Sequence, residues 1–292
     1  MPSRLDARAV ALAIIIMAIL GGTYTKVKVG LRDLPVIGSL LLRMLVAAVA
    51  LGTYACWARV PLRYRGRAAW FIAAGTLAFI AMQLLLYAGL TVTPAGRAAI
   101  LYNIQPFLTL LVLPYVLPTE RLTFRRVIGT GVAFAGVVLV LAERGTSGGS
   151  LLGDSLVLLA AATWTVVIIL NKTTPNEVNA VSLIFWNVAG AAPVLALLTV
   201  VVEPSVTWRL SAPAVASILY LGVLAAGVGF VGFVWLTRTY AATRVNAFVF
   251  LSPVFGVLIA SGALGESVTA LQAAGAPWGR IWYLDREQRE LT

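Results

Sequence analysis

Long apolar segments follow one another along most of the chain, with short polar loops between them. Each segment approaches the roughly 20 apolar residues that an α-helix needs to cross a bilayer. The pattern therefore predicts an all-α polytopic membrane protein with about ten transmembrane helices. The predicted spans are Ala9–Val29, Leu34–Trp57, Trp70–Leu90, Ala98–Leu117, Val127–Leu141, Ser155–Leu170, Ala180–Val202, Ala214–Leu236, Val245–Leu264 and Val268–Leu284.

The acidic side chains avoid these segments. All 11 Asp and Glu residues lie between or beyond the predicted spans, and the chain contains no histidine. The nearest is Asp154, directly before the span Ser155–Leu170, which could reach into it if that span begins earlier. The predicted membrane interior thus lacks the usual catalytic bases and metal ligands. With a single cysteine, Cys56, in addition, we expect no metal site, no cofactor and no enzymatic activity.

Composition and charge agree with a membrane location. Hydrophobic residues make up 60% of the chain and charged residues 11%, with a net charge of +11. The basic residues cluster in short loops, and roughly twice as many lie on one side as on the other, the majority side being that of the N-terminus. The positive-inside rule then predicts a multi-pass protein of the bacterial cytoplasmic membrane with its N-terminus in the cytoplasm. It also explains the net charge without a nucleic-acid partner.

The chain divides into two similar halves. The one Gly/Ser-rich joint, Glu143–Gly153, separates the predicted spans five and five, which predicts a first repeat over residues 1–144, a linker over 145–150 and a second repeat over 151–292. A proline lies nine positions after an arginine in both halves, in Arg97–Pro106 and in Arg244–Pro253. A Glu-x-x-Thr turn follows in each half, at Glu120 and Glu266.

An odd number of spans per repeat has a geometric consequence. If the first half begins inside, the second half begins outside, so the two repeats are inverted relative to each other. Many secondary transporters are built in this way, with the substrate site at the midplane between the repeats. The sequence therefore predicts two inverted five-helix repeats around a central cavity. One copy of the chain suffices for such a cavity, and the sequence does not indicate an oligomeric state.

The run from Ala242 to Glu266 resembles the penultimate helix of EamA-type carriers of the drug/metabolite transporter superfamily. The segments around Pro106, Thr163-Trp164 and Asn171-Lys172 are similar to other landmarks of that family. The resemblance covers roughly residues 9–275. It implies a ten-helix carrier of small metabolites and includes the amino-acid exporters of the YddG type. The last predicted span departs from the family pattern, because it contains Pro277 and Arg280.

A carrier needs polar or aromatic groups that face a central cavity, since such groups are costly against lipid. Arg43 lies well inside a predicted span, where it could attract a substrate carboxylate or could lock a helix end. The Asn and Gln residues could line the cavity or join helices by hydrogen bonds. The candidate cavity residues are Tyr24, Arg43, Gln83, Tyr87, Tyr102, Asn103, Gln105, Trp164, Trp186, Asn187 and Trp235.

Small residues and prolines inside the spans have two interpretations. They allow helices to approach each other closely, and they also allow a helix to bend or slide. The candidate hinge or packing positions are Gly21, Gly22, Pro106, Pro253, Gly227 and Gly229.

These observations and the resemblance together predict a secondary transporter that works by alternating access. The resemblance implies amino acids as substrates and export as the direction. Proton-coupled carriers usually use an acidic or histidine side chain inside the membrane, so we expect uncoupled facilitated diffusion. Two alternatives stay open. One is an exchanger of nucleotide sugars or phosphorylated metabolites, which would need several buried cations, and the other is a membrane receptor or channel.

Overall fold

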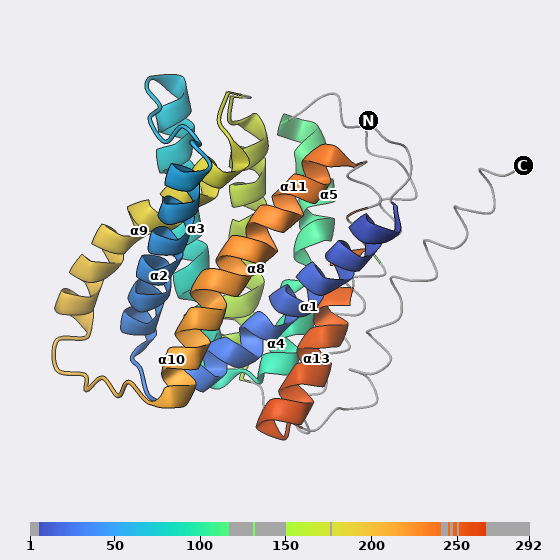
Figure 1. Ribbon diagram of the computed structural model, residues 1–292. Helices are drawn as coiled ribbons and strands as arrows, with labels where there is room; N and C mark the ends of the chain where they lie inside the picture. The colour runs from blue at the N-terminus through green and yellow to red at the C-terminus, as the bar shows by residue number, and fades with distance from the viewer. Residues whose placement is uncertain are drawn as a thin grey trace, which may run out of the picture.

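The computed structural model describes residues 6–116, 131, 150–175, 177–240, 245, 248, 249 and 251–266. Within these residues the chain is helical apart from turns and loops (Figure 1). The helices are α1 (Ala7–Gly30), α2 (Val36–Trp57), α3 (Arg67–Val92), α4 (Ala95–Tyr102), α5 (Gln105–Val116), α8 (Leu151–Thr173), α9 (Ala180–Val202), α10 (Ala212–Leu219), the π-helix η1 (Tyr220–Val231), α11 (Gly232–Thr239) and α13 (Leu251–Leu264).

Six stretches of these helices are long and apolar enough to cross a membrane, counting only the described residues. They are Ala7–Gly30, Val36–Trp57, Arg67–Val92, Leu151–Thr173, Ala180–Val202 and Ala212–Val231. The protein is thus an all-helical, multi-pass membrane protein. Of the predicted span Val127–Leu141 the structure describes residue 131 alone, and Val268–Leu284 lies outside the described residues.

The fourth predicted span is not one helix, so this prediction was wrong. Ala98–Leu117 was expected to be continuous, but α4 ends at Tyr102 and α5 begins at Gln105. Pro106 has no N–H group with which to bond the Tyr102 carbonyl, and its ring disfavours a continuous helix. The chain instead makes two tight turns, in which the Asn103 and Ile104 amides donate to Ile100 and Leu101.

The two halves of the chain interlock. Helix α3 packs along α8, α2 along α9, and α1 along α13, so each pair joins one helix from before the central linker to one from after it. Figure 1 shows α1 crossing the bundle obliquely, beside α13 at its lower end. The largest buried cluster draws side chains from both halves, which include Tyr24, Tyr87 and Val188. The core is therefore shared by the two halves.

The bundle has two chemically different ends. At the end we call the carboxylate end, drawn at the bottom of Figure 1, lie Asp33, Asp154, Glu203 and Glu266. The opposite end, which we call the arginine end, carries the α2–α3 loop with its basic residues Arg59, Arg63 and Arg65, and the start of α3 at Arg67.

Helix starts at the carboxylate end are capped in two ways. The side chains of Ser150 and Ser211 cap α8 and α10 locally, as Ser typically does. Helices α2 and α4 begin after Pro35 and Pro94, whose side chains carry no hydrogen-bond acceptor that could cap a helix. Their first amides donate instead to carboxylates from distant parts of the chain.

Two glutamates provide these distant caps. The Ile37 and Gly38 amides each donate to one oxygen of Glu203, at 3.0 Å. The Ala95 and Gly96 amides donate to the two oxygens of Glu266, at 2.9 and 3.0 Å. A carboxylate at a helix N-terminus satisfies unpaired N–H groups and interacts favourably with the helix dipole. Each glutamate thus ties a helix of the first half to one of the second half.

Candidate functional site

A buried arginine forms the centre of the candidate site. Arg43, on α2, is 2% exposed. Its Nη1 donates to the Tyr87 hydroxyl on α3 at 3.2 Å, and its guanidinium carbon lies 5.9 Å from the centre of the Tyr87 ring. Among the described residues Arg43 forms no ion pair. A tyrosine hydroxyl and a ring face therefore stabilise this charge, without a carboxylate.

Two more tyrosines belong to the same layer. Tyr24 on α1 and Tyr102 on α4 meet edge to face, with ring centroids 6.0 Å apart. The Tyr102 hydroxyl donates to the sulfur of Met82 at 3.4 Å. Counted along their helices, Arg43 and the three tyrosines lie roughly five to seven residues from the carboxylate end, or about 8–11 Å. We call these four residues the Arg43 layer.

Gln83 is the next polar group along the same face of α3. It lies one helical turn from Tyr87, is 3% exposed, and its Nε2 has no hydrogen-bond partner among the described residues. A buried amide donor without a partner is rare and costs roughly 1–3 kcal/mol. Such a group, one helical turn from the tyrosine that binds Arg43, indicates a place prepared for an acceptor.

A layer of aromatic rings lies beyond Gln83, toward the arginine end. The Trp164 ring lies between Phe79 and Phe230, with centroid distances of 6.5 and 5.6 Å. Trp164 and Phe79 are both about 20 Å from the carboxylate end, counted along α8 and α3. We call these three residues the aromatic layer. The predicted residues Tyr24, Arg43, Gln83, Tyr87, Tyr102 and Trp164 are thus brought into one region of the bundle.

Asn187 lies farther toward the arginine end, in a polar cluster that the sequence did not predict as such. Its Oδ1 is 3.4 Å from the Thr76 hydroxyl on α3, and the nearby Asn171 Oδ1 is buried without a partner among the described residues. A Cβ placed on Gly75 would lie 3.6 and 3.8 Å from the two amide oxygens. Thr76, Gln83 and Tyr87 share one face of α3, so polar groups recur along it from this cluster to Arg43.

The other predicted cavity residues lie elsewhere. Asn103 donates to the Ala99 carbonyl of its own helix, and Gln105 donates to Thr109 one turn away. Trp186 is 36% exposed and its indole donates to the Leu62 carbonyl in the α2–α3 loop. Trp235 is 49% exposed and its ring contacts Tyr240. The structure does not bring these four into the Arg43 layer or the aromatic layer.

The hinge or packing positions divide into close contacts and open ones. A Cβ on Gly21 would lie 2.5 Å from the Ser252 carbonyl oxygen, and one on Gly22 would lie 2.5 Å from the Tyr220 hydroxyl. One on Gly229 would lie 2.9 Å from Leu20, whereas Gly227 has open space. Close approach of α1 to α13 therefore requires glycine at Gly21, where a Cβ would meet backbone, whereas at Gly22 and Gly229 it would meet the ends of the Tyr220 and Leu20 side chains.

The two prolines have different surroundings in the chain. Pro106 is the second residue of α5, and proline is well tolerated in a first turn, where its missing N–H would have no partner within the helix. Pro253 lies in α13 and is preceded by helical residues at positions 245, 248 and 249. Pro106 additionally marks the break between α4 and α5.

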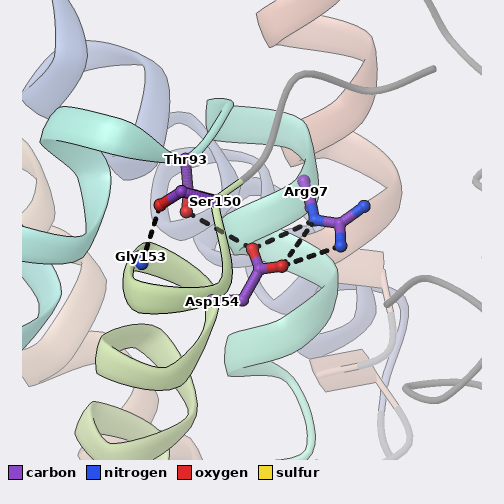
Figure 2. A network of polar contacts seen from close by, with 5 residues as sticks. All are labelled: Thr93, Arg97, Ser150, Gly153 and Asp154. Carbon is purple, nitrogen blue, oxygen red and sulfur yellow. Dashed lines mark hydrogen bonds and ion pairs between the residues drawn. The ribbon is translucent and has the colours of Figure 1, made fainter. Parts of the chain in front are cut away.

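Asp154 corrects the prediction that no acidic side chain lies inside a span. Helix α8 begins at Leu151 and not at Ser155, because Ser150 caps it, and Asp154 is completely buried in its first turn. Figure 2 shows Arg97 of α4 pointing at this carboxylate, with Nη2 2.7 Å from Oδ2 and Nε 3.0 Å from Oδ1. The Thr93 hydroxyl also donates to Oδ1, at 3.3 Å.

A further ionic contact lies close by. Lys28 of α1 donates to the Thr93 carbonyl at 2.8 Å and approaches Glu266 at 4.0 Å. The same Glu266 carboxylate caps α4. The sequence singled out Glu266 as a repeat marker, but it did not indicate that Lys28 and Glu266 meet at the start of α4.

A groove on the outer face of the bundle does not belong to the site. It is lined by Leu45, Val46, Val49, Ala50 and Val223, all of them apolar. Val49 is largely exposed. A face of this kind suits contact with lipid chains and offers no polar group that could orient a substrate.

Comparison with known proteins identifies the family. The EamA-like transporter family model matches the chain twice, over residues 7–142 and 151–278. A Salmonella typhimurium protein named "Probable amino-acid metabolite efflux pump" is 30% identical over 278 residues, which cover 91% of this chain and 90% of that protein. A Streptantibioticus cattleyicolor protein named "Probable terminal-alkyne amino-acid exporter" is 31% identical over 263 residues, or 88% and 85% of the two chains.

One solved structure has the same fold. A protein of known crystal structure superimposes with a TM-score of 0.65 at 18% sequence identity. The match covers 95% of this chain and 98% of that chain.

Proposed function

The chain belongs to the EamA-like transporter family, so it is a membrane transporter of small molecules and not an enzyme, and on that premise we propose that it exports amino acids. Two relatives, 30% and 31% identical to this chain, carry names that refer to amino-acid export or efflux. The observation that supports this best in the chain itself is Arg43, a buried cation that forms no ion pair within the described residues and lies among three tyrosines.

The proposed mechanism is alternating access between two inverted five-helix repeats, over residues 1–144 and 151–292, around a central cavity. It is supported by the separate family match of each half and by the interlocking pairs α3–α8, α2–α9 and α1–α13. In this mechanism the contacts at the carboxylate end close one side of the substrate site. We place the protein in the bacterial cytoplasmic membrane with its N-terminus inside, in accordance with the basic loops.

Labelling tests this topology. Single cysteines at Glu120, which lies outside the described residues, and at Glu266 should react with a membrane-impermeant maleimide from opposite sides of the membrane. Cys56 should first be replaced by serine, because it is exposed. Reaction of both positions from the same side would contradict the inverted arrangement.

We also propose that transport is not coupled to protons. The original reason, an interior without acids, does not hold, since Asp154 is buried. The proposal now depends on the pairing of Asp154 with Arg97, because protonating one partner leaves the other charge buried and unpaired, at a cost of about 3–5 kcal/mol. In proteoliposomes, amino acids should equilibrate down their gradient. Uphill accumulation driven by a pH step alone would contradict this.

The rival substrate class is less well supported. Nucleotide sugars and phosphorylated metabolites carry multiple negative charges and would need several cations. Within the described residues, the Arg43 layer contains one guanidinium, and the charge of Arg97 is opposed by Asp154. Counterflow with labelled amino acids and with labelled sugar phosphates would decide between the two classes.

A further inference from the structure

We propose that this carrier recognises its substrate by the carboxylate alone, through Arg43 and Gln83, and does not require the ammonium group. The inference depends on the proposed function for the site, and it adds which part of the substrate the protein reads. It predicts a substrate class wider than amino acids: carboxylates with an apolar or aromatic side chain, whether or not they carry a free amino group.

The first argument is the pair of donors. Arg43 is a permanent cation whose hydrogen bond in the structure is made to a neutral tyrosine at 3.2 Å. One turn from that tyrosine, the Gln83 Nε2 is buried without a partner among the described residues. A guanidinium and an amide N–H are donors only, and a carboxylate supplies the acceptors that both lack. A neutral acceptor would leave the charge of Arg43 unopposed.

The second argument is the position of the acids. Every acidic residue that the structure describes lies in a loop or at a helix end, and Asp154 in the first turn of α8 is already paired with Arg97. A substrate ammonium at the level of Arg43 would therefore meet no unpaired carboxylate within the described part of the chain. It would also lie near a positive guanidinium. The site as described is selective for the negative end of an amino acid.

The third argument is the surroundings. The aromatic layer of Phe79, Trp164 and Phe230 begins about 10 Å from Arg43 along the bundle, toward the arginine end and on the other side of Gln83. An apolar side chain that extends from the bound carboxylate would contact these rings. Tyr24 on α1 and Tyr102 on α4 add two aromatic rings to the Arg43 layer itself, in edge-to-face contact.

A competition assay tests the inference. Proteoliposomes exchange labelled phenylalanine in the presence of unlabelled analogues that retain either the carboxylate or the amine. Phenylpyruvate and N-acetylphenylalanine retain the carboxylate and should compete within about threefold of phenylalanine. Phenylalaninamide and phenethylamine retain the amine and should be at least about tenfold weaker, a difference of about 1.4 kcal/mol. Equal competition by amines and carboxylates would overturn the proposal.

Variants separate recognition from structure. Arg43→Gln should abolish the preference for carboxylates, whereas a purely structural role would lower exchange of all compounds equally and leave their ranking unchanged. Gln83→Glu places a negative charge one helical turn from Tyr87, the partner of Arg43, so it should weaken the carboxylates at least about tenfold and improve the amines. The matched control is Arg67→Gln, the same substitution at an exposed position of the arginine end, which should leave the ranking as in the wild type.

Failure of the proposed function gives a different result. If phenylalanine is not exchanged at all, the same analogues are tested for thermal stabilisation of the purified protein. Stabilisation by the carboxylates and not by the amines would retain the carboxylate site and reject amino-acid export. Exchange of phenylalanine without discrimination between the two analogue groups would retain amino-acid export and reject recognition through the carboxylate alone.

Discussion

Two buried arginines in this protein have opposite surroundings. Arg97 lies at the carboxylate end, where Asp154 accepts hydrogen bonds from its Nε and Nη2 (Figure 2). Arg43 lies about 10 Å inside the bundle, and its hydrogen-bond partner is the hydroxyl of Tyr87. Both side chains are almost inaccessible. The first charge is balanced within the protein, and the second is not balanced by any carboxylate in the described part of the chain.

The difference indicates two functions for the same residue type. A buried ion pair fixes the relative position of two helices, and removing one partner is strongly destabilising. A buried charge without a counter-ion costs stability, about 2.5–3.5 kcal/mol for Arg at the centre of a membrane helix. We infer that Arg97 holds α4 against α8, and that Arg43 is retained because the substrate supplies its counter-ion.

The largest expected effect comes from breaking the Arg97 pair. Asp154→Asn leaves the Arg97 guanidinium buried without its carboxylate and should lower the free energy of unfolding by about 3–5 kcal/mol. The melting temperature in detergent should fall clearly below that of the wild type. Arg67→Gln, at an exposed position, serves as the control and should leave the melting temperature unchanged.

Replacing both partners distinguishes the loss of a pair from a simple loss of packing. The double variant Arg97→Met with Asp154→Leu removes both charges, so it should recover most of the stability that Asp154→Asn loses. A double variant that is less stable than the single one would contradict the interpretation of Asp154 as a structural partner.

The distant helix cap should have an intermediate effect. Glu266→Gln retains one acceptor oxygen for the first amides of α4 but loses the charge and the second acceptor. We expect a cost of about 1–2 kcal/mol in the free energy of unfolding, measured by thermal denaturation. Glu203→Gln, which makes the equivalent change at α2, should cost a similar amount. A change below measurement error in both would show that the caps contribute nothing to stability.

The smallest effect concerns the neighbour of Arg43. Tyr87→Phe removes one hydrogen bond and keeps the ring face, so unfolding should become easier by only about 0.5–1.5 kcal/mol. Because the guanidinium is then more available, KM for the substrate in an exchange assay should stay the same or decrease. An increase in KM of more than about tenfold would show that the Tyr87 hydroxyl, and not Arg43, contacts the substrate.

Much of the fold could be predicted from the sequence. The lengths of the apolar segments predicted α9 with its bounds, Ala180–Val202. They also predicted the other five long apolar stretches to within a few residues at each end. The misplaced start of α8 had a local signal, since Ser150 is a typical N-cap residue four positions before Asp154. The break at Pro106 also had one, because proline disfavours a helix interior. The π-helix within Ala214–Leu236 had no sequence signal that we recognise.

The site was predictable in composition and not in arrangement. Tyr24, Arg43, Gln83 and Tyr87 could be selected because polar side chains are costly in a span. The carboxylate caps could not, because Glu203 and Glu266 are 165 to 171 residues away from the amides that they bind. Trp186 bonds the backbone at Leu62, 124 residues away, for which no periodicity gives a signal. Such contacts depend on how the two halves interlock.

One measurement tests the contrast between the two arginines most directly. Wild type, Arg43→Gln and Arg67→Gln are reconstituted in equal amounts of folded protein, and counterflow of labelled phenylalanine is recorded. The account predicts exchange at the same rate in wild type and Arg67→Gln, and a loss of at least about tenfold in Arg43→Gln although its melting temperature is no lower than that of the wild type. Undiminished exchange by Arg43→Gln would contradict the claim that the substrate supplies the counter-ion of Arg43.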